Sequence, residues 1–333
     1  MMNLSYDGRW MGPTGIGAVA AALIKRKPED IALQSLNYAG KISDPLSPLR
    51  LGAELRKLKS DVFWSPGFIP PFNSKTPDII TVHDLTHLHY YSAAHKIYYD
   101  VILRNIYKKC AKIITVSEYT KKELMEWGGY SSEMIDVVYN SVEPTFNADV
   151  DGVDMGWPYI FYAGNRRGYK NVDRLIEAYS ISVLPSAGIK LLLTGKSEPV
   201  IEQHIARLNV TGMVEFSGFI PEEDLPRYYK GALAVTYISL YEGFGLPILE
   251  GMATGVPVIT SNLSCMPEVA GNAALLVNPL DLDEIANAMN KIVADSDLRK
   301  DLISAGLVRA MDFTWDGSSN KFWNIVREVS ENK

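Results

Sequence analysis

Residues 239–251 read Ser-Leu-Tyr-Glu-Gly-Phe-Gly-Leu-Pro-Ile-Leu-Glu-Gly and follow an apolar run, residues 233–237, that predicts a strand. Gly243 and Gly245 allow the main chain to approach a ligand closely, and Pro247 suits the first turn of a helix. The free N–H groups at such a helix start favour an anion such as a diphosphate. The stretch therefore predicts a strand, a glycine loop and a helix that together bind an anionic ligand.

Two carboxylates lie eight positions apart in this stretch. Glu242 is in the glycine loop, and Glu250 is about one turn into the predicted helix. Both can accept hydrogen bonds from the hydroxyl groups of one ligand. The alternative is a structural turn before a capped helix, in which Glu250 merely favours the helix dipole.

The rest of the chain alternates short apolar runs with helix-period segments, which is typical of βαβ units and parallel sheets. A stretch rich in Pro, Gly, Asn and Asp, residues 143–158, interrupts the pattern and predicts a boundary between two doubly wound domains. Open parallel sheets bind ligands at the carboxyl ends of their strands, so we expect the site in the loops there. The strands are expected at residues 79–82, 113–116, 135–138, 159–163, 190–194, 214–216, 233–237 and 256–260, and the helices at 96–109, 172–180, 199–208, 247–253 and 282–295.

Composition excludes several classes of protein. With 333 residues, 47% of them hydrophobic and 22% charged, the chain has the balance of a globular protein of about two domains. A net charge of −6 argues against a nucleic-acid partner. Cys110 and Cys265 lie too far apart for a zinc cluster or a disulfide framework. No apolar run reaches the ~20 residues of a membrane span and no signal-peptide pattern is visible, so we expect a cytoplasmic protein.

The span from Glu242 to Glu250 resembles the Glu-x7-Glu signature of the retaining glycosyltransferases of family 4, which have the GT-B fold. Residues 162–171, 255–261 and 266–271 resemble the same family, and the resemblance runs over nearly the whole chain from Gly15. It implies two Rossmann-like domains that face a central cleft. Residues 1–150 would form the acceptor side, residues 157–312 the nucleotide-sugar domain, and residues 313–333 a helix that crosses back to the first domain.

The resemblance also implies roles for residues of the second domain. Glu242 would face the donor sugar, and Glu250 would hold the ribose hydroxyls. Lys170 and one of two adjacent arginines would neutralise the diphosphate, because cations in a loop after a strand can stabilise its growing charge. Arg166 is our choice for the catalytic arginine, and which of the two contacts the diphosphate stays open. The remaining donor contacts would be Arg167, Gly243, Phe244, Gly245 and Leu246, with Gly218, Phe219 and Ile220 against the nucleotide.

In the first domain, Gly15 and Gly17 precede a helix-like run, and in the family such a loop offers N–H groups to the donor phosphate. The alternative is a simple tight turn. The glycine fingerprint of dinucleotide folds is incomplete here, which disfavours a nicotinamide dehydrogenase. His83 ends a predicted strand, and the resemblance implies a contact with the donor sugar. Three further histidines follow within twelve residues, but without the accompanying ligands of a metal site, so we expect no metal and no cofactor.

A predicted helix over residues 94–112 carries five cations against Asp100 beside apolar side chains. Such a helix could lie on an anionic membrane surface, which suggests peripheral contact with the inner membrane face; the alternative is a solvated charged face. The cations are Lys96, Arg104, Lys108, Lys109 and Lys112.

These patterns together predict a retaining hexosyltransferase that needs no metal. It would move a hexose, with UDP-glucose the preferred donor, to a saccharide or lipid-linked acceptor in polysaccharide biosynthesis. A GDP-mannose-dependent mannosyltransferase and a nucleotide-sugar 2-epimerase on the same fold are the alternatives. A non-catalytic nucleotide-sugar sensor is disfavoured by the presence of Glu242, Glu250 and Lys170.

Overall fold

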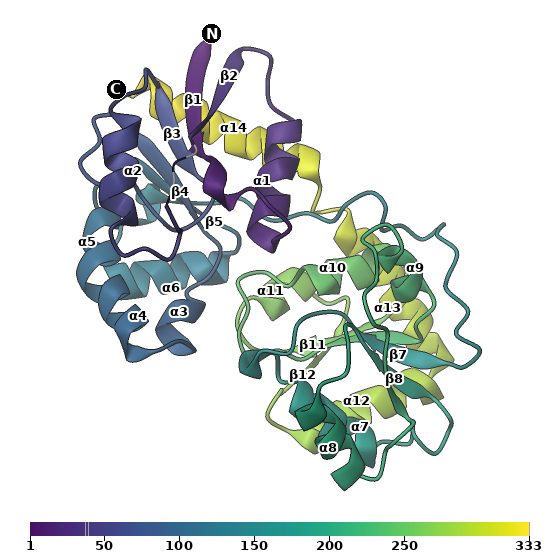
Figure 1. The fold of residues 1–333 in the computed structure, drawn as a ribbon. Coiled ribbons are helices and arrows are strands. Elements are labelled where there is room, and N and C mark those ends of the chain that lie inside the picture. The colour runs from purple at the N-terminus through teal and green to yellow at the C-terminus, as the bar shows by residue number, and fades with distance from the viewer. Residues whose placement is uncertain (37, 39, 333) are drawn as a thin grey trace. The chain divides into compact units, whose positions relative to one another are not determined.

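The computed structural model describes residues 1–36, 38 and 40–332, which form two compact units. Unit 1 comprises Met1–Asn140 and Trp315–Lys333, and unit 2 comprises Ser141–Thr314. Each unit is an α/β sandwich around one parallel sheet (Figure 1).

The sheet of unit 1 has six parallel strands in the order β2-β1-β3-β4-β5-β6. Neighbouring residues of its central strands alternate between two cores, because side chains along a strand point to opposite faces. Ile79 and Ile114 pack with helices α1 and α14, whereas Ile80 and Ile113 pack on the opposite face. The strands are β1 (Met2–Asp7), β2 (Ile31–Leu36), β3 (Val62–Ser65), β4 (Asp78–Val82), β5 (Lys112–Thr115) and β6 (Ile135–Val137), and the helices are α1 (Gly15–Lys25), α2 (Ser47–Leu55), α3 (Thr86–His89), α4 (Ala93–Tyr98), α5 (Arg104–Tyr107), α6 (Glu118–Gly128) and α14 (Trp315–Glu331).

The sheet of unit 2 has the order β12-β11-β10-β7-β8-β9, again all parallel. The chain proceeds outward from β7 in one direction and then from β10 in the other, so the strand order reverses between β7 and β10. Ligands of doubly wound sheets bind at the carboxyl ends of the two strands at this switch point. The strands are β7 (Tyr159–Tyr162), β8 (Lys190–Leu193), β9 (Val214–Phe216), β10 (Ala234–Tyr237), β11 (Val258–Ser261) and β12 (Leu275–Val277).

Helices cover both faces of this second sheet (Figure 1). Helices α7 and α12 pack together on one face, and α10 and α13 pack together on the other. The helices of unit 2 are α7 (Val172–Ile181), α8 (Pro199–Arg207), α9 (Leu225–Lys230), α10 (Leu246–Ala253), α11 (Met266–Ala270), α12 (Leu282–Ala294) and α13 (Ser296–Ala310), with a 3-10 turn η4 (Gly168–Lys170) before α7.

The boundary between the units lies at Asn140–Ser141, earlier than the predicted domain end at residue 150. The connecting segment belongs to unit 2 because it packs there. The Phe146 ring contacts the Tyr229 ring with centroids 5.5 Å apart, and Lys230 Nζ donates to the Ala148 carbonyl at 2.7 Å. The segment from Trp315 onward groups with unit 1.

The basic helix expected over residues 94–112 is shorter than predicted and is interrupted by a π-helical turn. Helix α4 passes into a π-helical turn, η2 (Tyr99–Leu103), and then into α5, which ends at Tyr107. Lys112 instead begins β5 and pairs with Asp136 at 3.0 Å. None of the helices in the described part of the chain is long and apolar enough to cross a membrane.

Candidate active site

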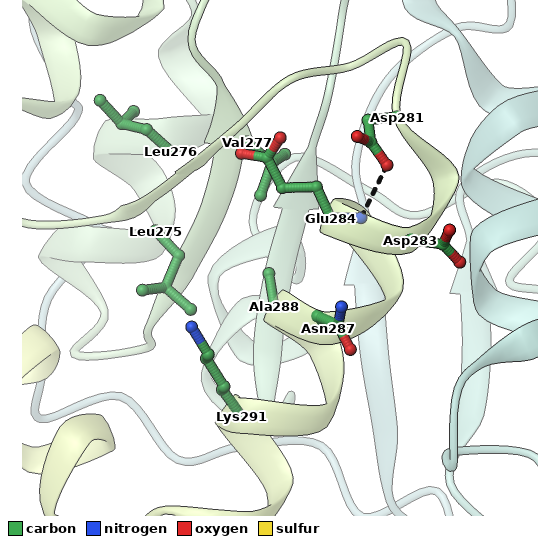
Figure 2. A pocket seen from close by; sticks show the side chains of 9 residues that line it. All are labelled: Leu275, Leu276, Val277, Asp281, Asp283, Glu284, Asn287, Ala288 and Lys291. Atoms are coloured by element: carbon green, nitrogen blue, oxygen red, sulfur yellow. Dashed lines mark hydrogen bonds between the residues drawn. The ribbon is translucent and has the colours of Figure 1, made fainter.

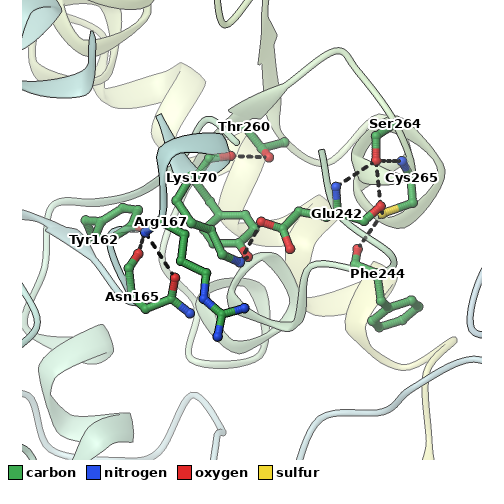
Figure 3. A network of polar contacts seen from close by, with 10 residues as sticks. Tyr162, Asn165, Arg167, Lys170, Glu242, Phe244, Thr260, Ser264 and Cys265 are labelled. Atoms are coloured by element: carbon green, nitrogen blue, oxygen red, sulfur yellow. Dashed lines mark hydrogen bonds and ion pairs between the residues drawn. The ribbon is translucent and has the colours of Figure 1, made fainter. Parts of the chain in front are cut away.

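The loops after β7 and β10 meet at the switch point of unit 2. The Leu240 N–H donates to the Tyr169 carbonyl at 2.8 Å, which joins the two loops directly. The first loop carries Lys170 and the second carries Glu242, so two segments far apart in the sequence form one site (Figure 3).

Lys170 and Glu242 form a largely buried ion pair. Lys170 Nζ lies 2.6 Å from Glu242 Oε1, and each side chain is 11% exposed. The same ammonium group donates to Tyr237 Oη at 2.8 Å and lies over the Tyr237 ring. These contacts hold a positive and a negative group side by side at the end of β10.

Asn171 fixes the backbone that presents Lys170. It has a left-handed conformation with φ of 61°, which asparagine tolerates better than most residues. Its Nδ2 donates to the carbonyls of Ile238, after β10, and Pro279, after β12. This buried amide therefore ties η4 to two strand ends, a contact between distant segments that no local pattern predicts.

Helix α10 begins directly after the glycine loop. Gly245 has φ of 95°, and a Cβ there would lie 3.1 Å from Ile248 Cδ1, so the turn into the helix requires glycine. At this helix start Pro247 has no N–H group and the Ile248 N–H already donates to the Gly245 carbonyl at 3.0 Å, so what the helix start offers an anion is mainly the positive end of the helix dipole. Leu246, the first helical residue, is partly buried.

The residues predicted to bind the nucleotide line one cavity of about 380 Å³. Tyr229 Oη donates a short hydrogen bond to Glu250 Oε2, and burial raises the pKa of Glu250 to about 7. Phe219 is 85% exposed at the rim, where an apolar ring can cover a ligand. The lining residues are Ala163, Gly164, Thr194, Gly195, Gly218, Phe219, Ile220, Leu225, Pro247 and Glu250.

The sequence did not decide which of two adjacent arginines contacts the diphosphate, and in the structure the two have different surroundings. Arg166 has a guanidinium group that donates to the carbonyls of Thr194 and Lys196 and pairs with Glu198 at 3.2 Å. Its side chain is only 7% exposed, so it braces the loop between β8 and α8. Arg167 is exposed in the loop that leads to Lys170. Because four of these donor contacts serve the loop, we favour Arg167 for the diphosphate, and the catalytic role of Arg166 stays a prediction.

The loop of Glu242 is held by two residues that sequence reasoning missed, Ser264 and Cys265. Ser264 Oγ accepts from the Glu242 N–H at 3.0 Å and donates to the Glu242 carbonyl at 2.6 Å (Figure 3). The single hydrogen of the Cys265 thiol is shared between the carbonyls of Glu242 and Phe244. A serine and a cysteine about 22 residues away in the sequence carry no pattern that would reveal this contact.

Phe244 was expected among the donor contacts, but its side chain belongs to the core. It is 4% exposed and packs edge to face with Phe313, with ring centroids 5.7 Å apart. Only its main chain can contact a ligand, as can that of its buried neighbour Gly243.

Of the two glycines predicted to contact the donor phosphate from unit 1, Gly17 has a local structural role. The Gly17 N–H donates to the capping hydroxyl of Thr14 at 3.1 Å, so this amide already has an acceptor within the helix cap. A Cβ on Gly17 would lie 2.2 Å from the Gly12 carbonyl oxygen, which shows that glycine is needed for packing. Around Gly15 there is no such obstacle.

His83 lies at the end of β4, as expected. Its Nε2 lies 2.9 Å from the Pro66 carbonyl, which can only accept, so Nε2 carries the hydrogen. Burial lowers the pKa of His83 and keeps the imidazole neutral. Its contact with a donor sugar stays a prediction.

The other histidines of this region have separate partners. His87 bonds Tyr99, His89 bonds Glu123, and His95 bonds Ser92. Over residues 1–36, 38 and 40–332, no group of three or more His, Cys, Asp or Glu is arranged to hold a metal ion.

Unit 1 contains a second cavity, of about 830 Å³ and mainly apolar. His87 is stacked between the rings of Tyr91 and Tyr99, at centroid distances of 4.5 and 5.2 Å, and this stack forms one wall. The remaining lining includes Arg9, Trp10, Lys41, Asp44, Phe68, His95 and Tyr98.

A third hollow, of about 480 Å³, lies between edge strand β12 and helix α12 (Figure 2). Its acidic groups serve the helix start, where Asp281 Oδ1 accepts from the Glu284 N–H at 3.0 Å. None of the predicted site residues lines it.

Comparison with known proteins places this geometry in a family. Residues 146–309 match the family model of glycosyl transferases group 1, and residues 19–146 match that of glycosyltransferase family 4. The chain is 29% identical over 299 residues to the O-antigen chain mannosyltransferase B of Escherichia coli, covering 85% of this chain and 78% of that one. It is 30% identical to the O-antigen chain mannosyltransferase RfbU of Salmonella typhimurium, covering 67% and 62%.

Solved structures share the fold over the whole length. Sucrose-phosphate synthase from Thermosynechococcus elongatus matches with a TM-score of 0.80 at 18% identity, covering 100% of both chains. Anabaena HepE, solved with UDP and glucose, matches with a TM-score of 0.78 at 16% identity, covering 98% of this chain and 100% of that one. With two family models that together span residues 19–309, and a GT-B fold, the chain belongs to the group 1 glycosyltransferases of the family 4 type.

Proposed function

We propose that this glycosyltransferase is a retaining mannosyltransferase that uses GDP-mannose and extends a bacterial surface polysaccharide. The observation that carries the proposal is the buried Lys170–Glu242 pair, in which Glu242 lies in the loop directly before α10. This arrangement combines groups that can stabilise a diphosphate with a carboxylate that can orient a sugar.

The donor sugar is chosen from the relatives in sequence. Both O-antigen relatives described above are named as mannosyltransferases. The preference for UDP-glucose has no support among them, and HepE, solved with UDP and glucose, is too distant in sequence to carry it. GDP-mannose is therefore the donor that we propose.

The phosphate groups would be neutralised from three sides. Lys170 and the exposed Arg167 supply cations, and the start of α10 supplies the positive end of its helix dipole, all without a metal ion. Glu250 would accept hydrogen bonds from the ribose hydroxyls inside its cavity. These groups act more strongly as the leaving diphosphate gains charge, which lowers the barrier.

Transfer would follow a same-face course. The bond between the sugar C1 and the diphosphate oxygen breaks, and the acceptor hydroxyl oxygen attacks C1 from the same side. Its proton passes to the departing phosphate oxygen. Glu242 would orient the sugar hydroxyls and favour the positive charge that develops on the ring; its pairing with Lys170 does not suit it to act as a nucleophile.

The acceptor would bind in the cavity of unit 1. Tyr91, 41% exposed at one end of the ring stack, offers a flat apolar face, and Lys41 and Asp44 offer polar groups at the side. A saccharide has the same combination of apolar ring faces and polar edges. We therefore propose a saccharide acceptor, free or lipid-linked.

The test is an assay of the purified full chain with GDP-mannose or UDP-glucose and a panel of mannose-terminated and glucose-terminated oligosaccharides. We expect mannosyl transfer with retained anomeric configuration by NMR, and unchanged activity in EDTA. Conversion of a nucleotide sugar to its 2-epimer without acceptor would instead identify an epimerase. Binding without any turnover would identify a sensor, and transfer from UDP-glucose alone would overturn the choice of mannose.

A further inference from the structure

The loop after β11 forms a set of hydrogen bonds around the backbone of Glu242, which we call the 264–265 clamp. Ser264 Oγ donates to the Glu242 carbonyl and accepts from the N–H groups of Glu242 and Cys265, at 2.6, 3.0 and 2.6 Å. A hydroxyl group has one donor and two acceptor positions, so this one is fully used.

Cys265 closes the other side of the clamp. Its thiol is fully buried and lies 3.1 Å from the Glu242 carbonyl oxygen and 3.2 Å from that of Phe244. Burial raises the pKa of this thiol well above its usual value, which keeps it protonated as a donor. The Glu242 carbonyl thus receives two hydrogen bonds from adjacent residues.

The clamp is built on unusual backbone. Ser264 has φ of 58°, a left-handed conformation that costs free energy in a residue with a side chain. A glycine would adopt it more readily but would lack the hydroxyl group. The conformation brings that hydroxyl group onto both polar groups of the Glu242 backbone.

We propose that Ser264, supported by Cys265, is a positioning residue that holds the Glu242 carboxylate beside Lys170 while the donor enters and the product leaves. The carboxylate is joined to Lys170 by an ion pair, and a donor diphosphate would compete for that lysine. Once Lys170 turns to the phosphate, the backbone clamp still fixes where Glu242 lies. The role rests on the proposed function of Glu242 as the group that orients the donor sugar.

Hydrogen exchange tests the clamp in the free protein, without any assumption about donor. In Ser264→Ala, the peptide that contains residues 240–246 should exchange at least about 10-fold faster than in the original chain. Ser261→Ala is the matched control, because Ser261 ends β11 just before this loop and its hydroxyl accepts from the Leu263 N–H instead of from Glu242. Equal exchange in Ser264→Ala and the original chain would overturn the proposal.

Kinetics then test whether the clamp acts through Glu242. Ser264→Ala should lower kcat for mannosyl transfer about 10- to 100-fold and change the KM for GDP-mannose less than about 3-fold. Ser264→Thr, which keeps the hydroxyl group, should restore most of kcat. In a Glu242→Gln background, Ser264→Ala should have no further effect, and a fully additive loss would overturn the proposal.

The outcomes also separate this proposal from the proposed function. If the original chain turns over no nucleotide sugar but Ser264→Ala loosens residues 240–246, the transferase proposal fails and the clamp stands as structure alone. If Ser264→Ala does not fold, Cys265→Ala gives the same tests, with a smaller expected loss because the Ser264 bonds remain.

Discussion

Lys170 Nζ lies 2.6 Å from Glu242 Oε1 although 72 residues separate the two in sequence. Because both side chains are about nine-tenths buried, each charge depends on the other for compensation. A donor diphosphate near Lys170 would add a second negative charge beside the pair. A change at either residue of the pair should therefore alter both the stability of unit 2 and the rate of transfer.

Lys170→Met should reduce transfer at least about 100-fold, because the cation that faces the diphosphate is lost. It should also destabilise the protein by about 3–5 kcal/mol, since Glu242 is left buried without its partner. Adding Glu242→Gln should restore part of that stability but no activity. Chemical denaturation and initial rates measure both effects, with Lys190→Met as control, because Lys190 pairs with Glu215 outside the site. An active Lys170→Met variant would contradict the assignment.

Substitutions of the two arginines should have different effects. Arg167→Ala should raise the KM for the donor about 10-fold and leave the thermal midpoint unchanged, because the side chain is exposed. Arg166→Ala should lower the midpoint by several degrees, because the loop after β8 loses its bonds to Thr194 and Lys196. The opposite pattern would return the diphosphate role to Arg166.

Nucleotide binding should depend on pH through Glu250, whose pKa is raised to about 7 by burial. The ionised carboxylate is the better acceptor for ribose hydroxyls, so GDP affinity should increase up to about 10-fold from pH 6 to pH 8. Tyr229→Phe removes a hydrogen bond that lowers this pKa, and should move the profile to higher pH. Calorimetric titration across pH measures both, and Glu250→Gln should abolish the dependence.

The same group should influence stability. The pKa of Glu250 rises from 4.5 to about 7 on folding, so the folded state holds its proton where the unfolded state has lost it. The contribution to the free energy of unfolding is complete below pH 4.5 and is lost as pH rises through about 7. Glu250→Gln should flatten this part of the stability profile.

Substitutions in the cavity of unit 1 should weaken acceptor binding and leave the reaction of the donor unchanged. Tyr91→Ala removes one face of the ring stack with His87 and should raise the KM for the acceptor about 10-fold or more. Slow hydrolysis of the donor, measured without acceptor, should not change. A parallel loss of donor hydrolysis would show that the cavity serves the donor instead.

Peripheral membrane contact is a separate prediction for unit 1. Ile97, Val101 and Ile102 are 61%, 58% and 41% exposed beside the cations of α4 and α5. Changing all three to serine should weaken binding to phosphatidylglycerol vesicles at least several-fold, and salt should weaken it as well. Ile181→Ser with Val183→Ser, exposed apolar positions of unit 2, is the control in vesicle sedimentation. Equal sedimentation of all variants would show that the surface formed by α4, η2 and α5 is solvated and does not bind the membrane.

Sequence reasoning located the strands that read as short apolar runs. β4 through β11 lie within two residues of the predicted ranges. It missed β2 and β12, edge strands whose exposed positions interrupt the apolar run. It also missed β1, where the buried Asp7 is compensated by Arg9, and β3, a fully buried strand of four residues.

The candidate site shows the same limit. Lys170, Glu242 and Glu250 stand out because their neighbours in sequence give them a recognisable context. The difference between Arg166 and Arg167 depends on where the loop after β8 passes, which no local pattern encodes. Contacts between distant segments, such as that of Ser264 with Glu242, emerge only from the fold.

The packing of α14 has a consequence for biosynthesis. The ring centroids of Phe322 and Trp64 lie 4.6 Å apart, and Trp323 Nε1 donates to the Leu23 carbonyl. The core of unit 1 therefore includes residues of α14, which are synthesised after unit 2. A ribosome that makes about 5–20 residues per second completes unit 2 before it delivers them. For on the order of ten seconds, the nascent first unit therefore exposes an apolar face, which a chaperone would be expected to protect.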